Sequence, residues 1–160
     1  MAQPRKELTL TKVVKASREV AFRAWTDPDL LVQWWGPAGV TGIECEIDPR
    51  VGGVFRVVML AGDDLGDQAG ERWPVRGVFL EVDPPARLVF TGQAIDDDGA
   101  LHLDGTTTVE FEDEGDGSTK ITVHAVAEGV SAQAPQMLQG MQQGWTESLD
   151  KLAAFAGGLA

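Results

Sequence analysis

Aromatic and methionine side chains are the residues of this 160-residue chain best suited to hold a small molecule. The sequence has five Trp, six Phe and four Met but no Tyr. Large rings and adaptable Met side chains line apolar ligand cavities, and they also fill ordinary hydrophobic cores. The candidates for a ligand cavity are Trp34, Trp35, Phe55, Val57, Met59, Val75, Phe90, Met137, Met141 and Trp145.

Polar residues that could perform acid–base chemistry are few. A catalytic histidine needs a hydroxyl or a carboxylate beside it on a cavity-facing position. His124 alternates with the run of Ile121 and Val123, which points it to the outer, solvated face. His102 lies beside a polar loop, with Asp104 two residues on, so we expect a solvated loop histidine. An acid or base at a cavity mouth is the alternative for His102, and no catalytic residue is assigned.

Metal and cofactor sites are not indicated. The run Asp96-Asp97-Asp98-Gly99 lacks the alternating ligands and the terminal Glu of a calcium-binding EF-hand loop. Two isolated histidines cannot form a zinc site by themselves. The single cysteine, Cys45, cannot form an intramolecular disulfide and is expected to act as a small buried hydrophobe. We therefore expect no metal and no cofactor.

Alternating and helical spacings define the elements that must position these residues. Residues 5–15 alternate as a first strand. Ser17 then caps a short helix, and Asp27-Pro28 begins a second one that carries Trp34 and Trp35 and ends at Gly36-Pro37. Six further strands are predicted at Thr41–Ile47, Val54–Leu60, Pro74–Val82, Arg87–Ala94, Leu103–Glu112 and Thr119–Glu128.

The last part of the chain has helical periodicity. Apolar residues recur there at spacings of 3, 4, 4 and 3, at Leu138, Met141, Trp145, Leu149 and Leu152. This pattern predicts one long amphipathic helix. Pro135 lies near its start, and Gly157-Gly158 lies past its end. Since no internal repeat or linker interrupts the pattern, we interpret residues 1–160 as a single domain.

A sheet of seven antiparallel strands needs a cover on its buried face, and one long helix is available for it. Because a twisted sheet is wider than one helix, we predict an α+β fold in which a curved sheet grips the helix and leaves an internal cavity. Gly140 and Gly144 share one face of that helix, where each costs about 1 kcal/mol relative to Ala. We interpret them as sites of close strand packing, with extra room above the sheet as the alternative.

The strand around Arg56 can face either way. If Phe55 and Val57 point inward, Arg56 points to solvent. In the opposite register Arg56 is a buried cation that could pair with a ligand carboxylate, or with Glu44 or Glu46. Valine residues on both faces of the strand leave the register open.

Acidic residues dominate the second part of the chain. Lys and Arg number 13 against 25 Asp and Glu, for a net charge of -12, and residues 60–160 hold 18 of the acids but 5 of the bases. Such a surface repels nucleic-acid backbones and anionic headgroups, so neither is an expected partner. No apolar run reaches the roughly 18 residues of a membrane-spanning helix, and residues 1–7 do not resemble a signal peptide. We expect a cytoplasmic protein, and a homodimer is compatible with the sequence.

Four segments resemble one known family. They are SREVAFRAWTDPDLLVQWWGP (17–37), DPRVGGVFRVVM (48–59), GVFLEVDPPARLVFT (77–91) and the Gly144-Trp145 pair. They look like the domains similar to the activator of the heat-shock protein 90 ATPase, in the START-like superfamily, also called SRPBCC. The resemblance implies the helix-grip fold. That superfamily includes polyketide cyclases and lipid-transfer domains, which share a cavity rather than a reaction.

These features favour the binding of a small hydrophobic or amphipathic molecule in an internal cavity. One alternative is an enzyme of cyclase or hydrolase type with His102, Glu110 or Arg56 as polar groups in the cavity. The other is a protein-interaction module of co-chaperone type, which would present an exposed apolar patch.

Two acidic loops should lie at the same end of the sheet, because alternate connections of an antiparallel meander share an end. The resemblance implies that loops at this end guard the cavity mouth. An acidic rim there would disfavour anionic ligands such as fatty acids. Its members are Asp63, Asp64, Asp67, Glu71, Asp96, Asp97 and Asp98.

Overall fold

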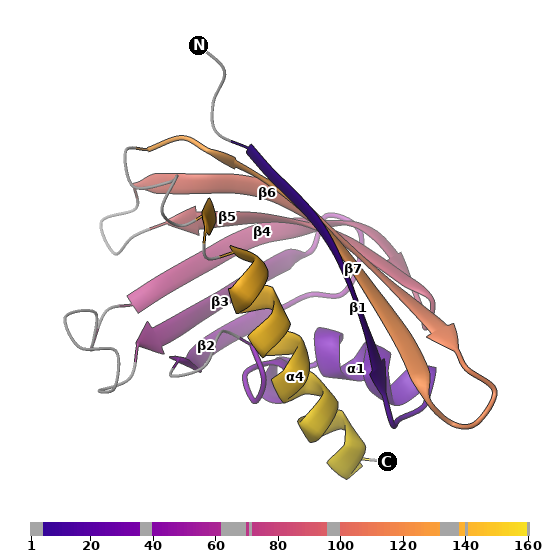
Figure 1. Cartoon of the computed structure of the whole chain (residues 1–160). Coiled ribbons are helices and arrows are strands. Elements are labelled where there is room, and N and C mark those ends of the chain that lie inside the picture. The colour runs from indigo at the N-terminus through magenta and orange to yellow at the C-terminus, as the bar shows by residue number, and fades with distance from the viewer. Residues whose placement is uncertain are drawn as a thin grey trace.

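The computed structural model describes residues 5–35, 40–61, 70, 72–95, 100–131, 138–139 and 141–159. In these ranges seven strands form one antiparallel sheet with the order β1-β7-β6-β5-β4-β3-β2 (Figure 1). From β2 to β7 each strand pairs with the next along the chain, and β1 pairs with β7. The strands are β1 (Arg5–Val14), β2 (Val40–Ile47), β3 (Val54–Ala61), β4 (Arg72–Asp83), β5 (Arg87–Ile95), β6 (Leu101–Asp113) and β7 (Thr119–Gly129).

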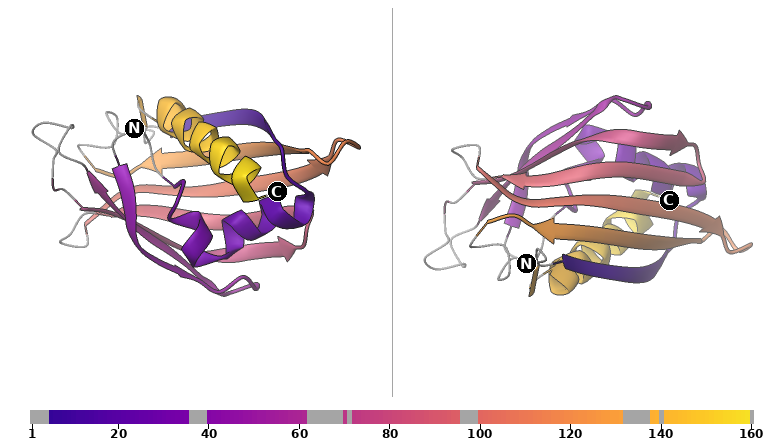
Figure 2. Two further views of the ribbon diagram at one scale, coloured as in Figure 1. Left: turned by 90° about the horizontal axis from the view of Figure 1, so that it is seen from below. Right: turned by 90° about the horizontal axis from the view of Figure 1, so that it is seen from above.

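The described helices lie on one face of the sheet. They are α1 (Arg18–Thr26), α2 (Pro28–Leu31) and α4 (Met141–Leu159). Figure 2 shows α4 and α1 side by side across the concave face of the curved sheet, while the strands form the opposite face. Leu149 and Leu152 of α4 are buried in the same core as Phe55 and Val57 of the sheet. The predicted α+β helix-grip fold is therefore confirmed.

Side-chain caps start the two short helices as the sequence predicts. The Ser17 hydroxyl accepts a hydrogen bond from the backbone N–H of Val20, at 3.3 Å, and the Asp27 carboxylate accepts one from Asp29, at 3.0 Å. The second helix is shorter than predicted, because α2 ends at Leu31. Trp34 and Trp35 follow it in a turn whose backbone N–H groups both bond to the Leu31 carbonyl.

The structure determines the register of β3. Phe55 and Val57 are fully buried, whereas the Arg56 side chain is 42% exposed on the opposite face. There its guanidinium lies 3.4 Å from the Glu44 carboxylate, and Arg72 bonds to the same carboxylate at 2.9 Å. Arg56 is therefore a surface cation, and the buried alternative is excluded.

Helix α4 is longer at its C-terminal end than predicted. It runs through Gly157 and Gly158 to Leu159, so the expectation that the glycine pair lies past the helix is wrong. Neither glycine has the positive φ that a C-terminal glycine cap uses, and both are exposed, where a missing side chain loses no packing. An ion pair of 2.7 Å between Lys12 and Asp150 joins α4 to β1. Among the described helices, none is both long and apolar enough to cross a membrane.

Strands β4 and β5 approach each other closely at Gly77. A Cβ at this position would collide with the backbone carbonyl of Thr91. The Thr91 hydroxyl also accepts a hydrogen bond from the backbone N–H of Val78, at 2.9 Å, and this bond fixes the approach. Gly92 on the same pair of strands differs, because a Cβ there would meet Val75 at an ordinary 3.7 Å.

We expect Gly77→Ala to lower the free energy of unfolding by about 1–3 kcal/mol, because the methyl group must push β4 away from β5. Gly92→Ala is the matched control and should leave the urea midpoint nearly unchanged. Equal midpoints for the two variants in urea denaturation would contradict the close approach at Gly77.

Candidate functional site

A cluster of aromatic rings fills the space where α1 meets the sheet and α4. The Trp25 ring lies 4.7 Å from that of Trp34 and 6.4 Å from that of Phe90, and it stacks at 6.2 Å on that of Trp145. Trp34 also donates a hydrogen bond from its indole to the carbonyl of Ala24, at 3.0 Å. Offset and edge-to-face rings at these distances attract one another beyond their burial. Trp25 and Trp34 are fully buried core, while Phe90 and Trp145 belong both to this cluster and to the wall of the neighbouring cavity.

A cavity of about 250 Å³ lies beside this cluster, between the sheet and α4. Of the ten predicted cavity residues, the structure brings six to its wall: Trp35, Met59, Val75, Phe90, Met141 and Trp145. The rest of the described lining comes from β5, β6, β7 and α4: Gly92, Ala94, Leu103, Gly105, Thr107, Ala125, Val126, Ala127, Gly144 and Ser148. That these residues bind a ligand stays a prediction.

Missing side chains explain why space remains here. Gly92 on β5 and Gly105 on β6 lie directly opposite each other in the register, and both belong to the lining. A Cβ at Gly92 would make only an ordinary contact with Val75, at 3.7 Å. A Cβ at Gly105 would instead collide with the backbone carbonyl of Val126, so Gly105 marks the close approach of β6 and β7. Gly144 faces the two glycines from α4, and a Cβ at Gly144 would have no atom within 4 Å. Our expectation that Gly144 marks close packing is therefore wrong, because the position provides room instead. Gly140 lies outside the described residues.

The remaining predicted cavity residues lie elsewhere. Trp34, Phe55 and Val57 are fully buried core and do not belong to the lining. Met137 and the seven predicted rim acids lie outside the described residues. The strand ends that flank the two acidic loops, the C-terminal ends of β3 and β5 and the N-terminal ends of β4 and β6, do lie at the same end of the sheet (Figure 1).

Sequence reasoning missed the small residues of the cavity floor. They occupy alternate positions on β5 and β7, the two strands that flank β6, with Gly92 and Ala94 on β5 and Ala125 and Ala127 on β7. Glycine or alanine at every second position of neighbouring strands leaves an inner face without bulk. That pattern was present in the sequence, but it becomes informative only when the order of the strands is known.

The lining is apolar and uncharged. None of the described residues in it carries a charge, and its polar side chains are Thr107 and Ser148, which are 8% and 6% exposed. The Ser148 hydroxyl donates to the carbonyl of Gly144, one turn earlier on α4, at 2.9 Å. The described lining can therefore solvate an apolar molecule and offer it hydroxyl groups, but its residues offer an ionised group no counter-charge.

The polar groups considered for catalysis lie outside the described lining. His102 is buried at the start of β6, where its Nδ1 lies 2.7 Å from the Ser131 hydroxyl, so the expectation of a solvated loop histidine is wrong. The strand begins at Leu101, two residues earlier than predicted, and this places His102 inside the sheet. Glu110 is exposed and lies 3.4 Å from Arg87.

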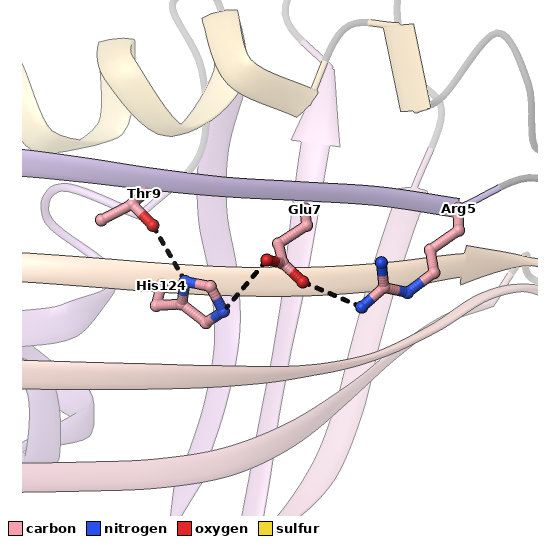
Figure 3. A network of polar contacts seen from close by, with 4 residues as sticks. All are labelled: Arg5, Glu7, Thr9 and His124. Carbon is pink, nitrogen blue, oxygen red and sulfur yellow. Dashed lines mark hydrogen bonds and ion pairs between the residues drawn. The ribbon is translucent and has the colours of Figure 1, made fainter.

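His124 points outward, as predicted. On the outer face of β1 and β7 its Nδ1 lies 2.9 Å from the hydroxyl of Thr9, and its Nε2 lies 4.0 Å from the carboxylate of Glu7 (Figure 3). Arg5 pairs with the same carboxylate at 2.8 Å. Within the part of the chain that the structure describes, no three His, Cys, Asp or Glu side chains are grouped to hold a metal ion.

Residues 15–157 match the family model described as activator of Hsp90 ATPase homolog 1-like protein. The chain belongs to this family. The resemblance of the four sequence segments is thereby confirmed, and the match spans the helices and strands that form the cavity. A comparison with curated proteins gives no match.

Solved structures show the same fold in bacterial relatives of this Hsp90-activator-like chain. A protein of Chromobacterium violaceum is 30% identical, with 94% of this chain and 96% of that chain covered and a TM-score of 0.75. The AHSA1 protein of Silicibacter pomeroyi is 26% identical over 97% of this chain and 100% of that chain, with a TM-score of 0.77. A protein of Mycobacterium smegmatis is 24% identical over 99% and 96%, with a TM-score of 0.71.

In this member of the family, the single cysteine is half-buried on β2 and packs against the core. Burial, together with the smaller effect of the negative charges of Asp27 and Asp29, raises the pKa of the Cys45 thiol to about 12. The thiol is therefore protonated at neutral pH, and the nucleophilic thiolate is scarce.

We expect native Cys45 to react with iodoacetamide at pH 8 at least about 100-fold more slowly than the urea-unfolded chain, whose cysteine has a pKa near 8.5. Mass spectrometry of the alkylated protein over time measures both rates, with N-acetylcysteine as the control for reagent chemistry. Equal alkylation rates would contradict the protected thiol.

The raised pKa of Cys45 also makes the stability of the fold depend on pH. Because the pKa is higher in the folded chain, the contribution of the thiol to the unfolding free energy is complete below about pH 8.5 and falls as the pH rises toward 12.

Proposed function

We propose that this protein binds a small hydrophobic molecule in the cavity between its sheet and α4. The observation that carries the proposal is the lining itself, which combines the indoles of Trp35 and Trp145, the ring of Phe90 and the Met59 and Met141 side chains around about 250 Å³ of space. Small-molecule sites are typically lined by apolar side chains, with a few polar atoms that orient the ligand.

The volume limits the size of the ligand. A dry apolar cavity of about 150 Å³ is large enough for benzene, and pockets for drug-sized ligands run from about 300 to 1,000 Å³. A cavity of about 250 Å³ lies between these values. It suits a molecule of one or two fused rings, or a short aliphatic chain.

Binding is favoured over catalysis by the position of the polar groups. His102 is hydrogen-bonded to Ser131, Glu110 lies beside Arg87, and Arg56 pairs with Glu44 on the outer face. An acid–base catalyst must reach the reacting atoms through hydrogen-bond distance or through one water. These side chains do not belong to the described lining, so they support no such role.

We expect naphthalene to bind the protein with measurable heat in isothermal titration calorimetry, and Gly144→Leu to weaken this binding at least about tenfold, because the new side chain occupies the cavity. Gly157→Leu is the matched control. It lies on the same helix, is exposed, and also has open space around its Cβ. Both variants gain helix propensity by roughly the same amount, so stability changes cancel in the comparison.

Two outcomes would contradict the proposed cavity binding. One is no binding of naphthalene to the unmodified protein. The other is an equal loss of affinity in the Gly144→Leu and Gly157→Leu variants, since that would place the ligand away from the cavity.

A further inference from the structure

Thr107 sits in the floor of the cavity. On β6 it lies opposite Phe90 of β5 and Ala125 of β7, and all three residues belong to the lining. Thr107 is 8% exposed. Its neighbours on both adjacent strands also face the cavity. The Thr107 side chain therefore points into the cavity as well.

The hydroxyl of Thr107 is available for hydrogen bonding. The structure records no side-chain hydrogen bond of Thr107 to a described residue, and its Oγ1 is not among the fully buried polar atoms that lack a partner, so the oxygen is reached from the cavity. Other buried hydroxyls differ, since Thr119 donates to the Ala16 carbonyl at 2.7 Å and Ser148 donates to the Gly144 carbonyl at 2.9 Å. Because polar groups inside proteins are nearly always hydrogen-bonded, a hydroxyl that opens onto an apolar cavity is available to a molecule that enters it.

The surroundings of Thr107 define the charge of that partner. Its neighbours in the described lining are rings, methyl groups and glycines, and none is charged. Transfer of an ionised carboxylate or ammonium into such a site has no counter-charge to offset the lost hydration. A neutral hydroxyl or carbonyl oxygen loses far less hydration free energy when it enters the cavity. One hydrogen bond to the protein recovers much of that loss.

We propose that the cavity selects a neutral, flat apolar molecule that carries one hydroxyl or carbonyl oxygen, and that Thr107 is the residue that recognises this oxygen. The proposal rests on the proposed function of the cavity and adds a ligand class and a specificity-determining side chain to it. The rings of Trp35, Phe90 and Trp145 contact the flat part of the ligand, and the Thr107 hydroxyl fixes its orientation.

Four probes of one ring system test the proposal by calorimetry at pH 7. Naphthalene and 2-naphthol differ by one hydroxyl, and 2-naphthamide and ionised 2-naphthoate have nearly the same shape but differ in charge. We expect 2-naphthol to bind about three- to tenfold more tightly than naphthalene, the gain of one neutral hydrogen bond. We expect 2-naphthoate to bind at least about tenfold more weakly than 2-naphthamide.

Substitutions on one strand assign the effect to Thr107. Thr107→Val keeps the β-branched shape and should remove the preference for 2-naphthol while naphthalene affinity stays within about twofold. Thr107→Ser keeps a hydroxyl and should keep the preference. Thr108→Val, the next residue on β6 and on its other face, is the matched control and should behave like the unmodified protein.

The outcomes separate the two proposals. If no probe binds, the proposed function fails and the assignment of Thr107 fails with it. If naphthalene binds but 2-naphthol binds no more tightly, or if Ser148→Ala rather than Thr107→Val removes the preference, cavity binding stands and the role of Thr107 is overturned. The comparison of the four probes needs no variant, so a failure of Thr107→Val to fold leaves the test intact.

Discussion

The indole of Trp25 joins all the layers of the protein. It contacts Trp145 on α4, Phe90 and Phe111 on the sheet, and Trp34 after α2. Burial of a Trp side chain contributes roughly 4–6 kcal/mol. Its Nε1 has no hydrogen-bond partner in the described structure, which costs about 1–3 kcal/mol, so burial outweighs the loss. Because these rings hold α4 at one end of the concave face, the helix does not have to pack tightly over the rest, and the space above the glycines stays open.

The sequence alone indicates most of the fold, because alternation, caps and helical spacing are local signals. Ser17 and Asp27 could be identified as caps from their neighbours along the chain. The face of β3 on which Arg56 lies could not be identified in this way, because valines on both sides of the strand make either face apolar. The pairing of β3 with β2 and β4 decides it. The role of Gly144 depends on what lies across from it. A helical glycine looks the same in sequence whether a strand or a void faces it.

Charge is distributed in opposite ways on the surface and in the interior. The chain carries a net charge of -12, and its described ion pairs, such as Arg5 with Glu7 and Arg87 with Glu81, have exposed side chains on both partners. The described cavity lining has no charge. Surface charge therefore acts on the approach of a ligand over a Debye length of about 10 Å at 0.1 M salt, while hydrogen bonding and shape act once it is inside. The two kinds of selection reside in separate residues and can be altered separately.

The two walls of the cavity differ in mechanical stiffness. The sheet wall is held by backbone hydrogen bonds between all neighbouring strands from β1 to β2, with register shifts in three strand pairs, and its shape cannot change without breaking several of these bonds. Helix α4 meets the sheet through side chains, in apolar contacts and the ion pair of Lys12 with Asp150. Apolar contacts are not directional, so a small shift of the part of α4 over the cavity breaks no backbone hydrogen bond of the sheet, while Leu149 and Leu152 stay packed in the core. A change in cavity height therefore requires repacking of side chains on α4, whereas a change in the shape of the floor requires breaking backbone hydrogen bonds between strands.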